Sequence, residues 1–167
     1  MFFVLCDFNI LKLSRTSQNA NVSGAVNHVC YNFFMDKNGL IIKTFVAWTK
    51  VKIKAHLSDR TQFFREGEIW WVNLGYNVGF ESNGKNNNFE RPILVIKRFN
   101  KDSFWGIPMS TQIKIGTYYY TFSLQGRQYC LNLSQMRLLS SKRMLRNIDI
   151  MKSEDVLAVR QRMRDFF

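Results

Sequence analysis

The sequence predicts a mainly β protein, in which short strands form a small barrel, with an N-terminal helical extension and a C-terminal helix. Three observations support this prediction. Short β-rich segments separated by turn residues recur after Arg65. Apolar residues at helical spacing precede this region and recur at its end. The 167 residues, 46% of them hydrophobic, suffice for one compact domain and an appendage.

The chain divides into three expected regions. Residues 1–34 form an extension of uncertain structure, because the segment SRTSQNANVSGAVNHV is polar and has no period. This extension is either disordered or a strand or helix that docks on the core. Residues 35–63 form a helical segment and a linker, and residues 64–167 form the main β domain.

The segment 41–56 predicts an amphipathic helix. Its apolar positions are three or four residues apart, and they are Phe45, Trp48, Val51 and Ala55. The lysines at 43, 50, 52 and 54 fall mostly on other faces. Either the helix packs on the core with a solvated lysine face, or the lysines contribute to a groove that binds nucleic acid.

The strands are predicted in chain order from runs of β-branched and aromatic residues. They cover 68–74, 92–98, 104–110, and a hairpin of 117–124 and 128–133 around a turn at 125–127. Pro108 indicates an edge strand or a bulge, because proline has no N–H to donate. Residues 76–90 predict a loop of a length that commonly carries function. Residues 138–150 give no clear pattern.

The C-terminal helix is predicted to begin with Ser153 as its N-cap. Glu154 and Asp155 follow at the positive end of the helix dipole, where acidic residues are stabilising. An apolar stripe then faces the core, and it consists of Val156, Val159, Met163 and Phe166.

The net charge of +12 predicts a polyanionic partner, which can be nucleic acid, an acidic protein or a membrane surface. Residues 91–167 carry most of the excess, with 14 basic and 5 acidic residues. No apolar run approaches the roughly 20 residues of a membrane span, so we expect no transmembrane helix. The three widely spaced cysteines favour a reducing, cytoplasmic compartment over a disulfide framework. With no zinc-ligand spacing, we expect no metal and no cofactor.

Five short motifs occur in order within residues 64–167. They are GEIW at 67–70, GFE at 79–81, RP at 91–92, PMST at 108–111 and LSQMR at 133–137. This ordered set resembles the MazF/PemK toxins of type II toxin–antitoxin systems. The resemblance implies an SH3-like barrel of the CcdB/PemK type that forms a homodimer. It also implies a metal-independent endoribonuclease that cleaves single-stranded RNA and is held inactive by an acidic cognate antitoxin, with DNA contacted only through the antitoxin complex.

The sequence departs from the family pattern at several positions. The loop between Glu81 and Arg91 is longer than usual, and Ser110 replaces the more usual threonine while keeping the hydroxyl. Ser134 and Asn132 stand where some members carry a catalytic Asp and Arg. That version of the site is therefore absent from this chain.

Arg91, Ser110 and Glu81 are the candidate catalytic residues. Cleavage by a neighbouring 2′-hydroxyl needs a proton acceptor, charge at the phosphorane and a proton donor for the leaving oxygen. Arg91 can bind two phosphate oxygens as a planar fork and stays charged. Ser110 can hydrogen-bond the phosphate or orient Arg91, and Glu81 can accept the 2′-proton or position Arg91. The alternatives are an ordinary surface arginine, a strand-end hydroxyl and a solvated loop carboxylate.

The candidate RNA-binding residues are Lys85, Phe89, Thr111, Gln135 and Arg137. Lys85 can grip phosphate and Phe89 can stack a base, or they are a solvated lysine and a loop-anchoring phenylalanine. Gln135 and Arg137 contact RNA, or they are structural or interface residues. The alternative function is a non-catalytic toxin or binding module that inhibits a target without cleaving RNA.

Overall fold

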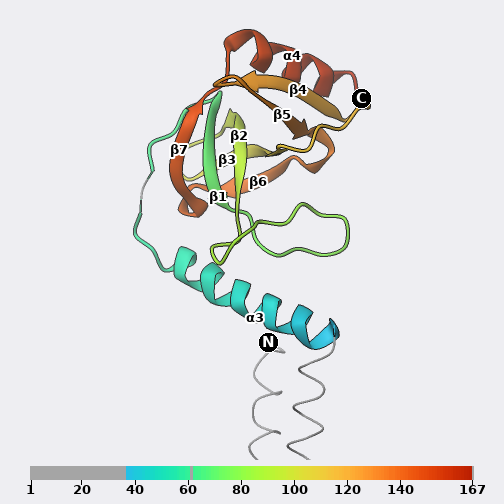
Figure 1. Cartoon of the computed structure of the whole chain (residues 1–167). Coiled ribbons are helices and arrows are strands. Elements are labelled where there is room, and N and C mark those ends of the chain that lie inside the picture. The colour runs from blue at the N-terminus through green and yellow to red at the C-terminus, as the bar shows by residue number, and fades with distance from the viewer. Residues whose placement is uncertain (1–36, 61, 167) are drawn as a thin grey trace, which may run out of the picture. The chain divides into compact units, whose positions relative to one another are not determined.

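The computed structural model describes residues 37–60 and 62–166 (Figure 1). The predictions for residues 1–34, which include Cys6 and Cys30, lie outside the described residues. The chain divides into two compact units, Met1–Lys43 and Thr44–Phe167. All contacts discussed below belong to the second unit. Within the described part, no helix is both long and apolar enough to span a membrane.

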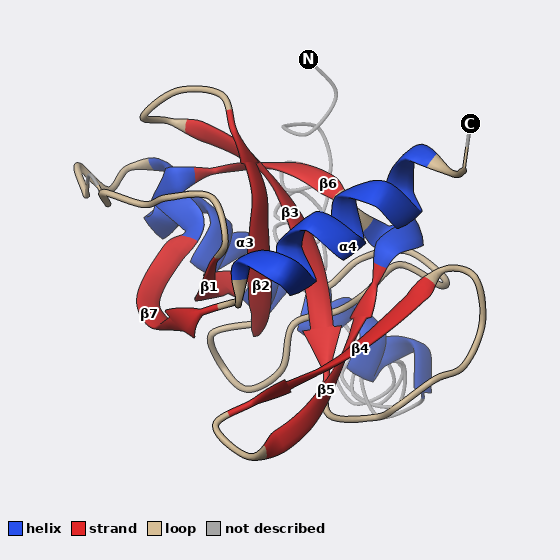
Figure 2. Cartoon of the chain, turned by 90° about the horizontal axis from the view of Figure 1, so that it is seen from above, coloured by secondary structure: helices blue, strands red, loops and turns tan. Residues whose placement is uncertain are grey.

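Seven antiparallel strands form one sheet, which confirms the mainly β prediction. They are β1 (Glu68–Asn73), β2 (Glu90–Arg98), β3 (Ser103–Ser110), β4 (Tyr119–Leu124), β5 (Arg127–Asn132), β6 (Arg137–Ser140) and β7 (Met144–Ile150). The strand order is β4-β5-β3-β2-β1-β7, and β6 pairs with β3 (Figure 2). The sheet is therefore not closed into the expected barrel, because β4 and β7 end it without pairing with each other in the described chain.

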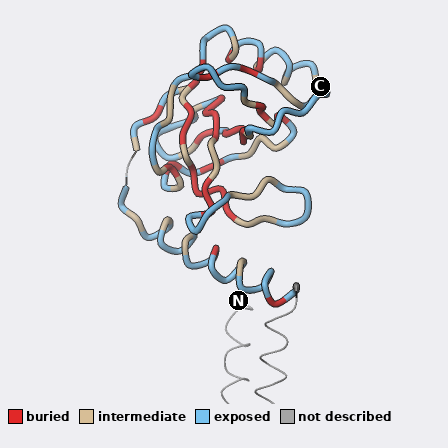
Figure 3. Tube along the Cα trace, in the orientation of Figure 1, coloured by how far each residue is buried: buried red, intermediate tan, exposed pale blue. Residues whose placement is uncertain are grey.

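Two buried clusters form on opposite faces of the sheet, because successive residues of a strand point to opposite sides. In β2, Leu94 and Ile96 belong to one cluster, whereas Ile93 and Val95 belong to the other. The buried residues therefore concentrate along the strands (Figure 3). The predicted β-rich segments form strands because their apolar side chains make up these two clusters.

Pro108 lies in a central strand, so of the two predicted alternatives, an edge strand or a bulge, the edge strand is wrong. One side of β3 pairs with β2. The other side pairs with β6 over residues 103–106 and with β5 from Met109 onward. Pro108 falls between these two pairings, at the position where β3 changes partners. The missing N–H is accommodated there.

The C-terminal helix α4 (Ser153–Arg164) packs against the first cluster through the predicted stripe, near β4 and β5 (Figure 2). Tyr120 Oη of β4 donates a hydrogen bond of 2.7 Å to Asp155 Oδ1 in its first turn. The predicted N-cap is wrong by one residue. Lys152 occupies the N-cap position without a side-chain capping bond, and Ser153 is the first helical residue.

The predicted N-terminal helix is confirmed as α3 (Lys37–His56), which begins four residues earlier than expected. Of its predicted apolar face, only Trp48 is fully buried, with 7% of its surface exposed. The Trp48 ring lies against Gly75, whose φ is +110°. A Cβ at Gly75 would come within 2.7 Å of the indole, so this close approach requires glycine.

Candidate functional site

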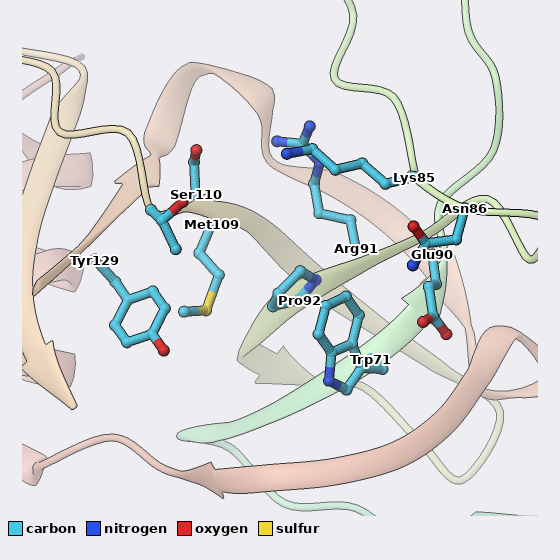
Figure 4. Close-up of a pocket in the computed structure, with 10 residues that line it drawn as sticks. Trp71, Lys85, Asn86, Glu90, Arg91, Pro92, Met109, Ser110 and Tyr129 are labelled. Carbon is cyan, nitrogen blue, oxygen red and sulfur yellow. The ribbon is translucent and has the colours of Figure 1, made fainter. Parts of the chain in front are cut away.

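A pocket of about 140 Å³ lies where β2 begins and β3 ends (Figure 4). Because these strands are antiparallel and Ile93 pairs with Pro108, the start of one strand lies beside the end of the other. The pocket is lined by Trp71, Lys85, Asn86, Glu90, Arg91, Pro92, Met109, Ser110, Thr111 and Tyr129. Four residues that the sequence nominated therefore meet here, and they are Arg91, Ser110, Lys85 and Thr111.

Arg91 is held at the wall of the pocket by the loop that precedes it. Its Nε donates a hydrogen bond of 2.6 Å to the backbone oxygen of Asn83. Burial lowers the pKa of the Arg91 guanidinium below its usual value. An arginine starts from so high a pKa that it still carries its charge at neutral pH. A phosphate would be contacted by the remaining hydrogens, on Nη1 and Nη2.

Ser110, the last residue of β3, and Thr111, which follows it, also line the pocket. Ser110 Oγ accepts a hydrogen bond of 3.0 Å from the backbone N–H of Gln112. A hydroxyl that accepts one bond can still donate its own hydrogen. Figure 4 shows Lys85 and Arg91 extending toward the same end of the pocket, with Ser110 on the other side. This arrangement offers cations and hydroxyl donors to one anionic group.

The long predicted loop is fixed by its own hydrogen bonds. Lys85 and Glu90 exchange backbone bonds of 2.8 and 2.9 Å, which closes a tight turn at the pocket rim. Gly84 N–H donates to the backbone oxygen of Gly75 at 2.7 Å. Lys85 is therefore presented from a braced turn.

The other four nominated residues do not line the pocket. Gln135 clamps the loop, because its Oε1 accepts from Ser82 N–H at 2.9 Å and its Nε2 donates to Phe80 O at 3.3 Å. The exposed carboxylate of Glu81 forms its ion pair with Arg137, at 3.9 Å. These side chains organise the loop in this structure.

Phe89 is the clearest departure from the sequence-based expectation. Only 8% of its surface is exposed, and its ring centroid lies 5.7 Å from that of Trp48. A ring buried in this way has no face to offer a nucleobase. The structure therefore corrects the base-stacking assignment and agrees with the alternative of a loop-anchoring phenylalanine.

Comparison with known proteins identifies the family. The sequence model of the family described as the PemK-like, MazF-like toxin of type II toxin–antitoxin systems matches residues 65–167. The chain belongs to this family. A comparison with curated protein sequences found no match.

A solved MazF structure shows the same fold. MazF (Form-I) from Deinococcus radiodurans is 17% identical, with a TM-score of 0.50 over 65% of this chain and 97% of that chain. An endoribonuclease in complex with its cognate antitoxin, from a mycobacterial species, is 9% identical, with a TM-score of 0.49 over 62% and 93%. At 17% identity the likeness to the Deinococcus protein concerns the fold alone.

An ion pair between buried Glu90, which lines the pocket, and half-exposed Arg146 was missed by the sequence analysis. Glu90, 5% exposed, accepts two hydrogen bonds from Arg146, of 2.9 and 3.0 Å. The Arg146 guanidinium carbon lies 4.8 Å from the centre of the Trp71 ring. Hydrogen bonding to Arg146 lowers the pKa of Glu90 and outweighs burial, which raises it. These residues are far apart in the sequence, and they become neighbours only through the pairing of β1 with β2 and β7. The sequence alone therefore could not show the cluster.

Arg146→Ala is expected to destabilise this toxin fold by about 2 kcal/mol at neutral pH. The substitution leaves the buried Glu90 carboxylate unpaired, but the Arg146 side chain is 53% exposed, so the loss is below the 3–5 kcal/mol typical of fully buried pairs. The pKa of Glu90 is lower in the folded state than in the unfolded state. The ion pair therefore stabilises the wild-type fold above the unfolded-state pKa of Glu90, and this stabilisation is lost as pH falls through the folded-state pKa.

Urea unfolding at about pH 7 and about pH 3 measures this effect. The difference in unfolding free energy between wild type and variant should narrow at the lower pH, because acidification protonates Glu90 and removes the charge that Arg146 pairs. Arg127→Ala, at an exposed position in the β4–β5 hairpin, is the matched control and should change stability little. A stability difference between wild type and Arg146→Ala that widens on acidification would contradict the role assigned to the Glu90–Arg146 ion pair.

Proposed function

We propose that this toxin is an endoribonuclease that cleaves single-stranded RNA without a metal ion. The observation that carries the proposal is the convergence of Arg91 and Ser110, from two strands, on one pocket that Lys85 and Thr111 also line. Cations and hydroxyl donors around a small pocket suit a phosphodiester, whose transition state gains negative charge. Membership of the MazF-like family supports the same activity.

In the proposed reaction the 2′-hydroxyl attacks the adjacent phosphorus. The O2′–P bond forms, the P–O5′ bond breaks, the 2′-proton passes to a base, and a proton is delivered to the leaving 5′ oxygen. The products carry a 2′,3′-cyclic phosphate and a 5′-hydroxyl. Arg91 stabilises the charge on the phosphorane, Ser110 and Thr111 donate to its oxygens, and Lys85 binds a neighbouring phosphate.

Electrostatic stabilisation is the main contribution of these residues. Glu90 lines the pocket, but Arg146 holds its carboxylate and lowers its pKa, which makes it a weak proton acceptor. Glu81 is exposed on the neighbouring loop and paired with Arg137. The proposal therefore depends on Arg91 and not on a strong acid–base pair.

We also propose that an acidic cognate antitoxin inhibits the enzyme, that the toxin acts as a cytoplasmic homodimer, and that it meets DNA only through the antitoxin complex. The description of the family as the toxin of a type II system supports an antitoxin partner. The net charge of +12 gives an acidic segment a complementary surface.

Cleavage of a long single-stranded RNA in EDTA tests the proposed function. We expect discrete cuts whose fragments carry 5′-hydroxyl and 2′,3′-cyclic phosphate ends, mapped by sequencing. An identically prepared Arg91→Ala protein excludes a contaminating ribonuclease. Intact RNA, from folded protein shown to be free of antitoxin, would refute the proposed nuclease and favour the non-catalytic toxin.

A further inference from the structure

The helix α3 lies outside the family match, which begins at residue 65, yet its second half is docked on the toxin domain. The Arg143 guanidinium lies 5.4 Å above the Trp48 ring, and Arg143 Nη1 donates to the backbone oxygen of Asn73 at 2.9 Å. Lys142 Nζ donates to the backbone oxygen of His56 at 2.9 Å. This places a cation at the C-terminal end of α3, where positive charge stabilises a helix. These contacts fix a lysine-bearing helix beside the domain.

A cationic depression lies between α3 and the segment 140–145. It consists of two hollows of about 500 and 650 Å³, one on each flank of α3, which share Ala55, Leu57 and Lys142 in their walls. We name this depression the α3 cleft. Its cations are Lys52, Lys54, Arg60, Lys142 and Arg143. No carboxylate is among the described residues that line it, although Asp59 lies next to Arg60 in the sequence.

The α3 cleft and the candidate pocket are separated by a single turn. Lys85 and Asn86 line the pocket, and Asn88, two residues further on, lines the cleft. Two residues of chain span at most about 7 Å. The turn is also braced from the cleft side, because Asn73 Nδ2 donates to the backbone oxygen of Asn88 at 2.7 Å. A polymer that occupies the pocket can therefore cross this turn and continue into the cleft.

We propose that the α3 cleft binds the sugar–phosphate backbone of the RNA strand whose scissile phosphate occupies the Arg91 pocket. The inference rests on the proposed RNA substrate and assigns a function to the extension. A phosphate at every nucleotide matches several cations, and no carboxylate is among the described residues that line the two hollows. Asn88 and the half-buried Ser58 add polar groups to the lining. Continuity with the pocket favours RNA over an acidic protein segment as the occupant.

The test measures binding and not cleavage. A fluorescent single-stranded RNA with 2′-O-methyl groups lacks the attacking nucleophile, so the unmodified full chain can be titrated with it at several salt concentrations. The double variant Lys52→Gln, Lys54→Gln removes two exposed cleft cations from a helix surface that tolerates glutamine. The matched control, Lys50→Gln with Lys101→Gln, removes two exposed lysines that do not line the cleft.

We expect the cleft variant to bind this RNA about tenfold more weakly than wild type at low salt. Its slope of log affinity against log salt should be smaller by about 1.4, because each lost phosphate contact on a single strand removes about 0.7. The control should differ from wild type by less than about twofold. RNA affinity and salt slope equal to those of the control would overturn the proposal. Weaker binding of an acidic antitoxin peptide with unchanged RNA affinity would also overturn it, and would identify a protein surface.

This experiment separates the two proposals. If the cleft variant loses RNA affinity while wild type leaves RNA intact in EDTA, the proposed nuclease function fails and the binding inference stands. If wild type cleaves RNA and both double variants bind it equally, the cleft inference fails and the nuclease function stands.

Discussion

Arg91→Ala is expected to reduce the rate constant of RNA cleavage by about 10²–10³-fold, which is the usual cost of removing one preorganised donor from a developing oxyanion. Arg91 lines the pocket, and its Nε is fixed on the Asn83 backbone at 2.6 Å. The guanidinium is therefore in place before RNA binds. The measurement is a single-turnover assay at saturating enzyme, which isolates the chemical step from substrate affinity.

The conservative variant Arg91→Lys tests why arginine is needed. Lysine keeps the positive charge but loses the planar fork and the Nε donor to Asn83. We expect a rate between those of wild type and Arg91→Ala. A rate for Arg91→Lys equal to wild type would show that charge alone suffices and that the bidentate contact is not used.

Two controls distinguish lost chemistry from lost structure. Arg127→Ala removes an exposed arginine in the β4–β5 hairpin and should cleave at the wild-type rate. The thermal midpoint of Arg91→Ala should fall by only a few degrees, because one hydrogen bond contributes about 1 kcal/mol. An Arg91→Ala protein that cleaves RNA within about twofold of wild type would remove Arg91 from the mechanism.

Local patterns predicted most of the fold. The β4–β5 hairpin could be predicted because two β-rich runs flank a short turn. In the structure the turn residues Gln125 and Gly126 have φ of +50° and +75°, as two-residue hairpin turns require. The C-terminal helix follows from its apolar stripe. The open sheet and the position of Pro108 could not be predicted, because they depend on which strands become neighbours.

The candidate site also has one part that could be predicted from the sequence and one part that could not. Arg91, Ser110 and Lys85, three of the candidate residues in the sequence analysis, line one pocket. The roles of Phe89 and Gln135 depend on tertiary contacts, since Phe89 turns inward to meet a helix that begins 52 residues earlier. No spacing within a motif carries that information.

Trp48→Ala is expected to destabilise the second unit by about 3–5 kcal/mol, the usual cost of truncating a buried aromatic side chain. The indole contacts Gly75, Phe89 and Arg143, and it is the only fully buried residue of the predicted apolar face. Urea unfolding measures the change. Limited proteolysis within residues 57–63 should also accelerate, because α3 loses its main anchor. Unchanged stability and unchanged proteolysis would show that α3 is not docked through Trp48.

The double-mutant cycle with Gly75→Ala tests the docking geometry itself. Gly75→Ala alone has two costs: about 1–3 kcal/mol for a non-glycine residue at a φ of +110°, and about 1–3 kcal/mol because the new Cβ would lie 2.7 Å from the indole. In the Trp48→Ala background the second cost disappears, so the two substitutions should be non-additive by about 1–3 kcal/mol. Gly126→Ala is the matched control, since its φ is +75° and nothing lies within 4 Å of the added Cβ. Its cost should be the same with and without Trp48. Strict additivity at Gly75 would mean that helix and loop do not meet as described, and the cationic cleft beside them would lose its structural basis.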